Sequence, residues 1–167
     1  MLSIIGKVIQ GYQVASGQSK KDRRFEGGTI RQQEPYLAAL GFNLSEYFND
    51  NLFYGTLNVD ISPYQFELLY PEWTIRNVAW SHQVDAENFF FSSAELIQKQ
   101  KRYKALHYFP DPKTKPPEHT HDSSLIEIIA EPITDLNYGD PVEILIAINR
   151  LRISEKPESA ATIITLR

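Results

Sequence analysis

The sequence predicts a mainly β protein that folds as one small, closed or nearly closed barrel with one or two short helices. Short segments rich in β-branched and aromatic residues alternate with turn-forming residues along most of the chain, which is typical of antiparallel sheets. Many short strands with few helices favour a barrel. The predicted strands cover residues 2–10, 57–61, 66–70, 73–80, 88–97, 102–109, 125–131 and 142–148.

A single domain accounts for the chain. Its 167 residues are enough to bury a hydrophobic core, and no repeat or change of composition marks a second unit. We expect residues 1–153 to form the barrel and residues 154–167 to form a C-terminal tail, in which 161–166 is a candidate edge strand. An edge strand can pair with another copy of the chain, so homo-oligomerisation stays open.

Two short helices are predicted between the first two strands. The first covers residues 35–40, with Pro35 tolerated in its first turn and Gly41 ending it. The second runs to about residue 51 and begins at the run Asn43-Leu44-Ser45-Glu46, which resembles a capping box.

Composition excludes several classes of protein. The net charge of −4 argues against general nucleic-acid binding, which needs a basic surface. The absence of cysteine excludes disulfides, thiolate metal sites and a thiol nucleophile. The apolar residues 1–5 are too few for a signal peptide, and no later apolar run is long enough to span a bilayer. We therefore expect a soluble, cytoplasmic protein with no nucleic-acid or membrane partner.

The stretch 53–61 carries the clearest functional pattern. Gly55 permits the turn that opens it, and side chains then alternate between two faces of a strand. One face is apolar and faces a core, whereas the other carries Thr56, Asn58 and Asp60. Hard oxygen donors of this kind suit Mg²⁺. Because Thr56 and Asn58 are neutral and would hold the bare ion weakly, we expect the ion to arrive already bound to phosphates. The alternative is a half-exposed strand whose polar face meets only water.

A long loop over residues 11–28 is a candidate phosphate-binding segment. It contains the densest basic cluster of the chain, residues 20–24, and glycines lie on both sides of that cluster. Backbone N–H groups beside glycines, together with Lys and Arg, can hold phosphates through charge-assisted hydrogen bonds. The alternative is a solvated loop without a ligand. The candidate nucleotide-binding residues are Gly11, Ser16, Gly17, Lys20, Arg23 and Arg24.

A second, proline-rich loop covers residues 110–124. His119 and His121 lie there and would face the same way in an extended segment, so they could bind a metal, although no third ligand is evident. The alternative is a surface loop that happens to hold two histidines. Further on, Glu127 interrupts an apolar strand, and such a carboxylate either lies on an exposed face or is kept for a partner.

Several segments occur in the order found in a known family. They are Gly6-Lys7-Val8 followed by Gly11, a helix ending in Leu40-Gly41-Phe42, Gly55-Thr56-Leu57-Asn58-Val59, and Glu127-Ile128-Ile129-Ala130 before Gly139-Asp140. Over about residues 4–148 the chain resembles the archaeal CTP-dependent riboflavin kinases. The Gly-Thr-Leu-Asn-Val segment is the most specific part of the resemblance.

The resemblance implies a six-stranded cradle-loop barrel and an enzyme that transfers the γ-phosphate of CTP to riboflavin, giving FMN. It implies Mg²⁺ ligation by Thr56 and Asn58 and flavin contacts by Thr120 and Glu127. It places the nucleotide loop at residues 11–17. The implied ligands are a nucleoside triphosphate with riboflavin or FMN, and positioning with charge neutralisation would then carry the reaction.

Two other functions remain open at this point. The wide spacing of Gly11 and Gly17 favours a non-catalytic module that binds a flavin or nucleotide on the same barrel. The third hypothesis is an oligomeric interaction protein that uses either the aromatic run Phe89-Phe90-Phe91 or the C-terminal strand as a contact surface, although at strand spacing at least one of these rings belongs in the core.

Overall fold

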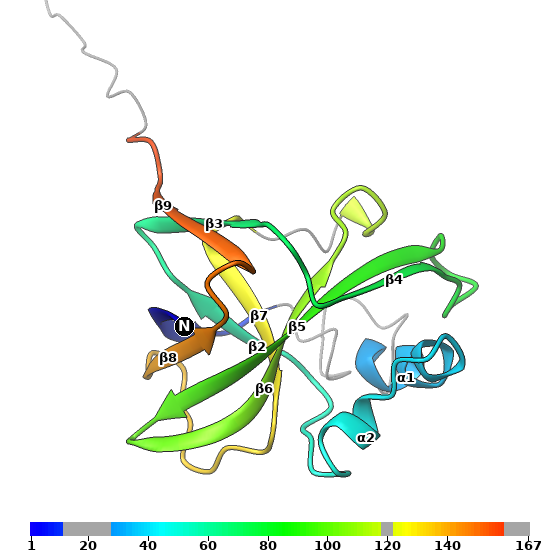
Figure 1. Ribbon diagram of the computed structural model, residues 1–167, viewed down its shortest axis with the longest axis horizontal. Helices are drawn as coiled ribbons and strands as arrows, with labels where there is room; N and C mark the ends of the chain where they lie inside the picture. Colours follow the sequence, from blue (N-terminus) through cyan, green and yellow to red (C-terminus); the bar gives the residue numbers. More distant parts are fainter. Residues whose placement is uncertain (12–27, 118–121, 159–167) are drawn as a thin grey trace, which may run out of the picture.

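Six strands close into an antiparallel barrel in the computed structural model, which describes residues 1–11, 28–117 and 122–158 (Figure 1). The barrel order is β1, β2, β7, β6, β5, β8 and back to β1. The barrel strands are β1 (Leu2–Ile9), β2 (Leu57–Asp60), β5 (Glu87–Gln98), β6 (Lys101–Pro110), β7 (Leu125–Ala130) and β8 (Pro141–Ile146). The predicted mainly β barrel is thus confirmed.

Three further strands lie outside the closed ring. Strand β4 (Trp73–Val78) extends the sheet beyond β5, and β3 (Tyr64–Leu68) pairs with β9 (Leu151–Glu155). Strand β9 was not predicted, and it runs past residue 153, so Ser154 and Glu155 pair with β3 rather than starting a tail. Backbone bonds from Ile61 to Ser124 and from Phe66 to Ser123 tie β3 and its approach to the start of β7.

The barrel interior is filled by one of the two faces of each strand. Alternate residues point inward, as the strand period requires, and almost all are aliphatic. We call this set, together with Leu151 of β9 that packs with it, the barrel core: Ile4, Val8, Val59, Ile61, Ala94, Leu96, Ala105, Ile126, Ile128, Ala130, Val142, Ile144, Ile146 and Leu151.

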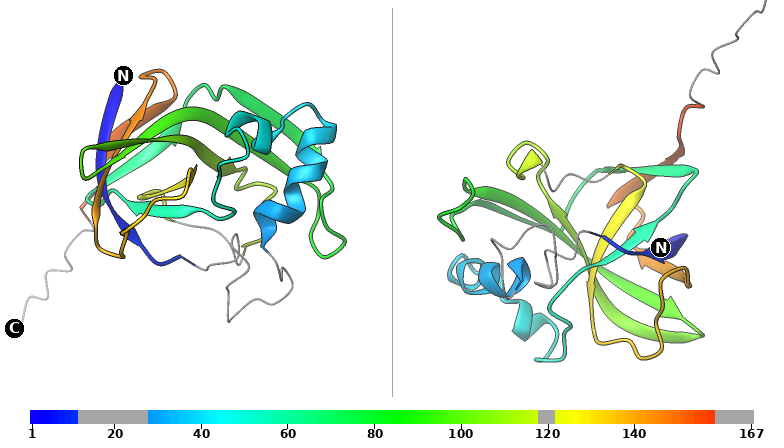
Figure 2. Two further views of the ribbon diagram at one scale, coloured as in Figure 1. Left: turned by 90° about the horizontal axis from the view of Figure 1, so that it is seen from below. Right: turned by 180° about the vertical axis from the view of Figure 1, so that it is seen from behind.

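A second cluster lies outside the barrel, beneath two helices. Helix α1 (Thr29–Ala39) and helix α2 (Leu44–Tyr47) cover the outer face near β4 and β5 (Figure 2). This outer cluster is rich in aromatic rings: Ile30, Leu37, Phe42, Leu44, Phe48, Leu52, Val78, Trp80, Phe89, Phe91, Leu106, Tyr108 and Ile129. Phe89 and Phe91 are fully buried here, which confirms that at least one ring of the aromatic run 89–91 belongs in the core, whereas Phe90 is only half-buried.

Both helices differ from the predicted bounds. Helix α1 starts at Thr29, so Pro35 lies in its middle instead of its first turn. Burial of Ile30, Gln33 and Leu37 along one stripe outweighs the backbone hydrogen bond that a proline removes. Gly41 adopts a φ of 92° and ends the helix as predicted.

Helix α2 is shorter than predicted but starts where expected. The side chain of Asn43 accepts a hydrogen bond from the backbone N–H of Glu46 at 3.0 Å, which confirms the cap. The helix does not reach residue 51, because Asn49 and Asp50 adopt left-handed φ values of 51° and 60°.

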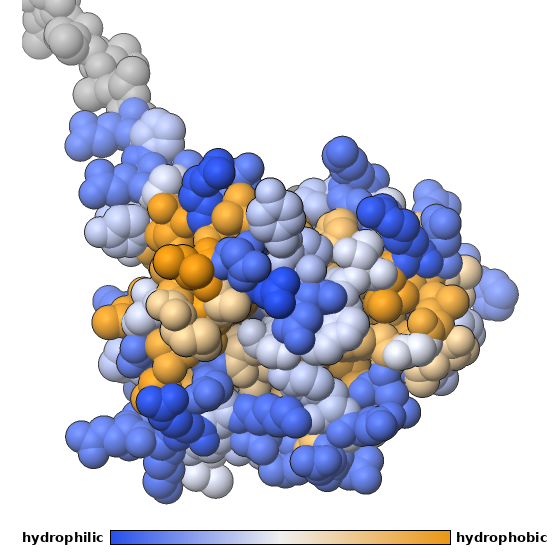
Figure 3. Space-filling view, in the orientation of Figure 1, coloured by the Kyte–Doolittle hydropathy of each residue, from blue (hydrophilic) through white to orange (hydrophobic). Residues whose placement is uncertain are grey.

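The molecular surface is mixed in character. On the face shown in Figure 3, apolar residues gather in one area over β8 and β9 and in another beside β4, with polar residues between them. Within the described ranges, neither helix has the length and hydrophobicity needed to cross a membrane.

Candidate functional site

Strands β2 and β7 bring together three of the predicted site residues. The strands are antiparallel, with Asn58 directly opposite Glu127, so both side chains lie on the same outer face of the barrel. Thr56, just before β2, donates a hydrogen bond from Oγ1 to Oε1 of Glu127 at 3.4 Å. Residues from distant parts of the sequence thus form one polar cluster.

Asn58 is not the water-facing residue that an ordinary half-exposed strand would have. Its side chain is buried, with 6% exposed, and its Oδ1 atom has no hydrogen-bond partner in the part of the chain that the structure describes. A buried amide oxygen without a partner costs free energy, so Oδ1 of Asn58 is the polar atom of this cluster that calls for an explanation.

Gly11 packs directly against this amide. A Cβ atom at position 11 would overlap the Nδ2 atom of Asn58, so only glycine fits beside an undisplaced Asn58. Gly11, predicted as a nucleotide-binding residue, therefore lies next to the predicted metal ligand.

The third polar residue on this face of β2 has another role. Oδ1 of Asp60 accepts a hydrogen bond from the backbone N–H of Ser62 at 2.8 Å, which stabilises the turn after the strand. Asp60 therefore belongs to the turn and not to the cluster.

Lys115 joins the cluster from the loop after β6. Its Nζ atom lies 3.4 Å from Oε2 of Glu127, and the two side chains are only 12% and 11% exposed. Glu127 is thus a shielded carboxylate on the outer face of the barrel whose partners include Thr56 and Lys115, and it does not lie on an open surface. An ion pair this shielded is weakly screened by salt.

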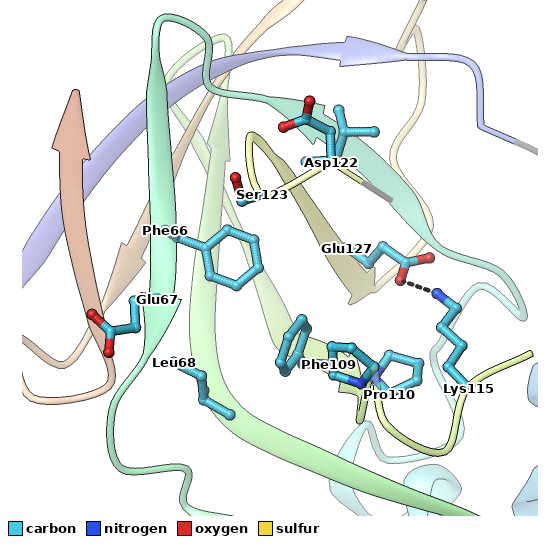
Figure 4. A pocket seen from close by; sticks show the side chains of 11 residues that line it. Phe66, Glu67, Leu68, Phe109, Pro110, Lys115, Asp122, Ser123 and Glu127 are labelled. Carbon is cyan, nitrogen blue, oxygen red and sulfur yellow. Dashed lines mark hydrogen bonds and ion pairs between the residues drawn. The ribbon is translucent and has the colours of Figure 1, made fainter. Parts of the chain in front are cut away.

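A pocket of about 310 Å³ opens on the other side of Glu127. It forms where β6 and β7 separate, since the two strands pair only from Ala105 to His107. Figure 4 shows the rings of Phe66 and Phe109 on one side of this pocket and the Glu127–Lys115 pair on the other. The pocket lining is Phe66, Glu67, Leu68, Phe109, Pro110, Pro112, Lys115, Asp122, Ser123, Leu125 and Glu127.

Aromatic contacts fix the apolar wall of the pocket. The ring of Phe66 meets the ring of Phe109 edge-on, with centroids 5.4 Å apart. The same ring meets His107 at 5.6 Å, also edge-on. This wall offers flat, rigid surfaces of the kind that hold a planar ring system.

Two buried titratable groups lie near the pocket. Burial raises the pKa of Glu87 to about 7, although its Oε2 accepts a hydrogen bond from Nε1 of Trp80 at 2.7 Å. Burial lowers the pKa of His107 to about 4, so its ring is neutral at physiological pH. Neither ring nitrogen of His107 has a hydrogen-bond partner among the described residues.

The other predicted site residues lie outside the described residues. These are Ser16, Gly17, Lys20, Arg23 and Arg24 of the first loop, Thr120 of the second, and the histidines His119 and His121. Among the residues that are described, no group of three or more His, Asp or Glu side chains is placed to hold a metal ion.

The sequence did not single out Lys115, Phe66 or Phe109 as site residues. Lys115 is one lysine in a proline-rich loop, and the two phenylalanines were interpreted as strand residues. One signal in the sequence could have linked Lys115 to the site. Its loop leads directly into an apolar strand that is interrupted by the carboxylate of Glu127. Comparison of the chain with protein-family models and with curated proteins finds no match.

Proposed function

We propose that the chain is a riboflavin kinase-like phosphotransferase. The hydroxyl oxygen of the ribityl chain would form a bond to the γ-phosphorus of a nucleoside triphosphate, the bond to the β-phosphate oxygen would break, and the hydroxyl proton would be released. The observation that carries this proposal is the convergence of Thr56, Asn58, Glu127 and Gly11 beside a pocket lined by aromatic rings.

The donor set fits a phosphate-bound Mg²⁺. Oγ1 of Thr56 and the unpartnered Oδ1 of Asn58 are the oxygens that would hold it, and both are neutral. When bound, the ion would neutralise phosphate charge. Gly11 supports this by letting the backbone approach Asn58 without displacing the amide.

The pocket supports a flavin as the acceptor. Its volume of about 310 Å³ is at the lower end for small-molecule sites, so it suits the ring system of the ligand with the sugar-like chain leading outward. Phe66 and Phe109 offer the ring faces, and Glu127 stands between this wall and Thr56, where a ribityl hydroxyl would arrive.

The direct test is to incubate the protein with riboflavin, Mg²⁺ and each nucleoside triphosphate and to measure FMN by chromatography. Asn58→Ala should lower the rate at least about 100-fold, as loss of an electrostatic contact to the reacting groups does. Asp60→Asn is the matched control on the same strand face and should keep the wild-type rate. Absence of FMN with every triphosphate would contradict kinase activity.

The second candidate is a module that binds a flavin or nucleotide without turnover. The Glu127–Lys115 ion pair favours it, because a carboxylate already paired with an ammonium is a poor acceptor for a hydroxyl proton. A rise in melting temperature with riboflavin, without FMN formation, would distinguish this candidate.

A further inference from the structure

The charges around the pocket are unequally distributed. Three carboxylates line it, Glu67, Asp122 and Glu127, whereas Lys115 is the one cationic side chain among its described lining residues. Two of these carboxylates are paired to bases that do not line the pocket. Glu67 pairs with Arg152 at 2.9 Å, and Asp122 pairs with Lys156. An anionic group of a ligand therefore has one favourable place in the described lining, beside Lys115 and Glu127.

Hydrogen bonds order the turn that carries Lys115. The backbone N–H of Lys115 donates to the carbonyl of Asp111 at 2.8 Å, closing a turn. Asn88 at the start of β5 makes three hydrogen bonds to this turn: its N–H donates to Oγ1 of Thr114 at 2.9 Å, its Nδ2 donates to Oδ2 of Asp111 at 3.2 Å, and its carbonyl accepts from the N–H of Asp111 at 2.9 Å. The lysine thus starts from an ordered turn, so fixing its stem on ligand binding costs little further entropy.

The ammonium of Lys115 has hydrogen-bonding capacity beyond Glu127. It carries three protons, and the hydrogen bond to Oε2 of Glu127 uses one of them, at a long 3.4 Å. A phosphate monoester accepts charge-assisted hydrogen bonds more strongly than a hydroxyl does. Because the lysine is largely shielded from water, such a bond would be little weakened by salt.

We propose that Lys115 binds the phosphate monoester of the pocket's ligand, so that the protein prefers a phosphorylated flavin to the unphosphorylated one. This inference rests on the proposed function, because it takes the flavin to be the pocket's occupant. It adds a specificity residue that the resemblance does not supply, and it makes the product the tighter ligand.

The test compares the dissociation constants of FMN and riboflavin by flavin fluorescence, with EDTA present to remove divalent cations. Lys115→Met should weaken FMN binding about tenfold or more and leave riboflavin binding within about twofold. Lys115→Arg should keep most of the preference. Lys113→Met is the matched control, because it removes the same charge from an exposed position of the same loop and should change neither constant.

A second variant guards against misfolding. Removing Lys115 alone takes the ammonium away from the shielded carboxylate of Glu127, which is strongly destabilising, whereas Lys115→Met combined with Glu127→Gln removes both charges. The double variant should lose the FMN preference, and Glu127→Gln alone should keep it. An unchanged ratio of the two constants in the double variant would overturn the inference.

The outcomes separate the two proposals. If the wild type makes no FMN but prefers it, and the lysine variants lose that preference, the kinase proposal fails and the role of Lys115 stands. If the wild type makes FMN and the ratio of constants does not depend on Lys115, the kinase proposal stands and this inference fails. Binding of neither flavin by the wild type would overturn both.

Discussion

The barrel core and the outer cluster share strands β5, β6 and β7 but differ in kind. The barrel core is aliphatic, whereas the outer cluster is rich in aromatic rings and includes the hydroxyl of Tyr108, which donates to Oε1 of Gln33 at 3.1 Å. A six-stranded ring encloses only enough space for side chains. Polar groups that could meet a ligand are therefore placed outside the ring and where two of its strands separate.

Strand β7 shows this division within neighbouring residues. Ile126 and Ile128 point into the barrel core, and Ile129 belongs to the outer cluster. Glu127 points outward to Thr56 and Lys115. One strand thus stabilises the fold with one face and forms the candidate site with the other, so adjacent substitutions should have different effects.

The largest expected effect comes from Ile128→Ala. This side chain is fully buried in the barrel core, and its truncation should lower the free energy of unfolding by about 2–5 kcal/mol. Chemical denaturation measures this loss, and binding of riboflavin to the folded fraction should persist. Glu127→Gln combined with Lys115→Met, which removes both charges of the adjacent outward pair, should instead change ligand binding more than stability. An equal loss of stability in this double variant and in Ile128→Ala would contradict the division.

The second prediction concerns the buried carboxyl group of Glu87, next to the outer cluster. The pKa of Glu87 is raised from 4.5 to about 7 by burial, so the unfolded chain ionises first as the pH rises. The free energy of unfolding should therefore fall between pH 4.5 and 7, by about 3 kcal/mol, relative to Glu87→Gln. Urea denaturation of both proteins across this range measures the difference. Parallel profiles would show that Glu87 ionises as easily in the folded protein.

The third prediction concerns His107 on the barrel side, where the free energy of unfolding should depend on pH with the opposite sign. The pKa of His107 is lowered from 6.5 to about 4 by burial, so its contribution to stability is complete above pH 6.5 and is lost as the pH falls toward 4. His107→Leu should remove this loss, again about 3 kcal/mol, while leaving the protein at least as stable at pH 7. Acid denaturation followed by circular dichroism makes the comparison, and an unchanged acid midpoint would refute it.

The smallest expected effect tests the cover of the outer cluster. Asn43→Ala removes the cap of α2, whose Leu44 lies in that cluster, and should cost about 1 kcal/mol. Amide hydrogen exchange should accelerate in α2 and not in the barrel strands. Asn51→Ala, at an exposed position beyond the helix, is the control. Acceleration throughout the barrel would show that the two regions are not separable.

The sequence was sufficient for eight of the nine described strands but not for their partners. The apolar residues of β1, the alternation along β2 and the β-branched content of β7 and β8 identified these strands, because strand signals are local. Strand β9 was missed because it is short and carries the charged residues Arg152 and Glu155. Its pairing with β3 is what defines it as a strand. The early start of α1 was missed because Pro35 predicted the first turn of a helix at that position. Packing on the outer cluster outweighs this preference and extends the helix toward the N-terminus.

The candidate site was predictable only in part, for a similar reason. Thr56 and Asn58 follow from one strand, and the resemblance added Glu127, but nothing local shows that Asn58 and Glu127 are opposite each other. The burial of Asn58 and its contact with Gly11 also depend on tertiary structure. Lys115 was missed because its position depends on hydrogen bonds between the loop and Asn88.

The short contact between β6 and β7 has a mechanical consequence. These strands pair at three positions, as do β1 and β2, whereas β5 and β6 pair at ten, so the ring has two short seams and the pocket adjoins the one between β6 and β7. Opening of this seam would widen the pocket, and a molecule bound between Phe109 and Glu127 would hold the two strands together. Ligand binding in the pocket and closure of the ring would then be coupled, so that the bound ligand strengthens the contact between β6 and β7.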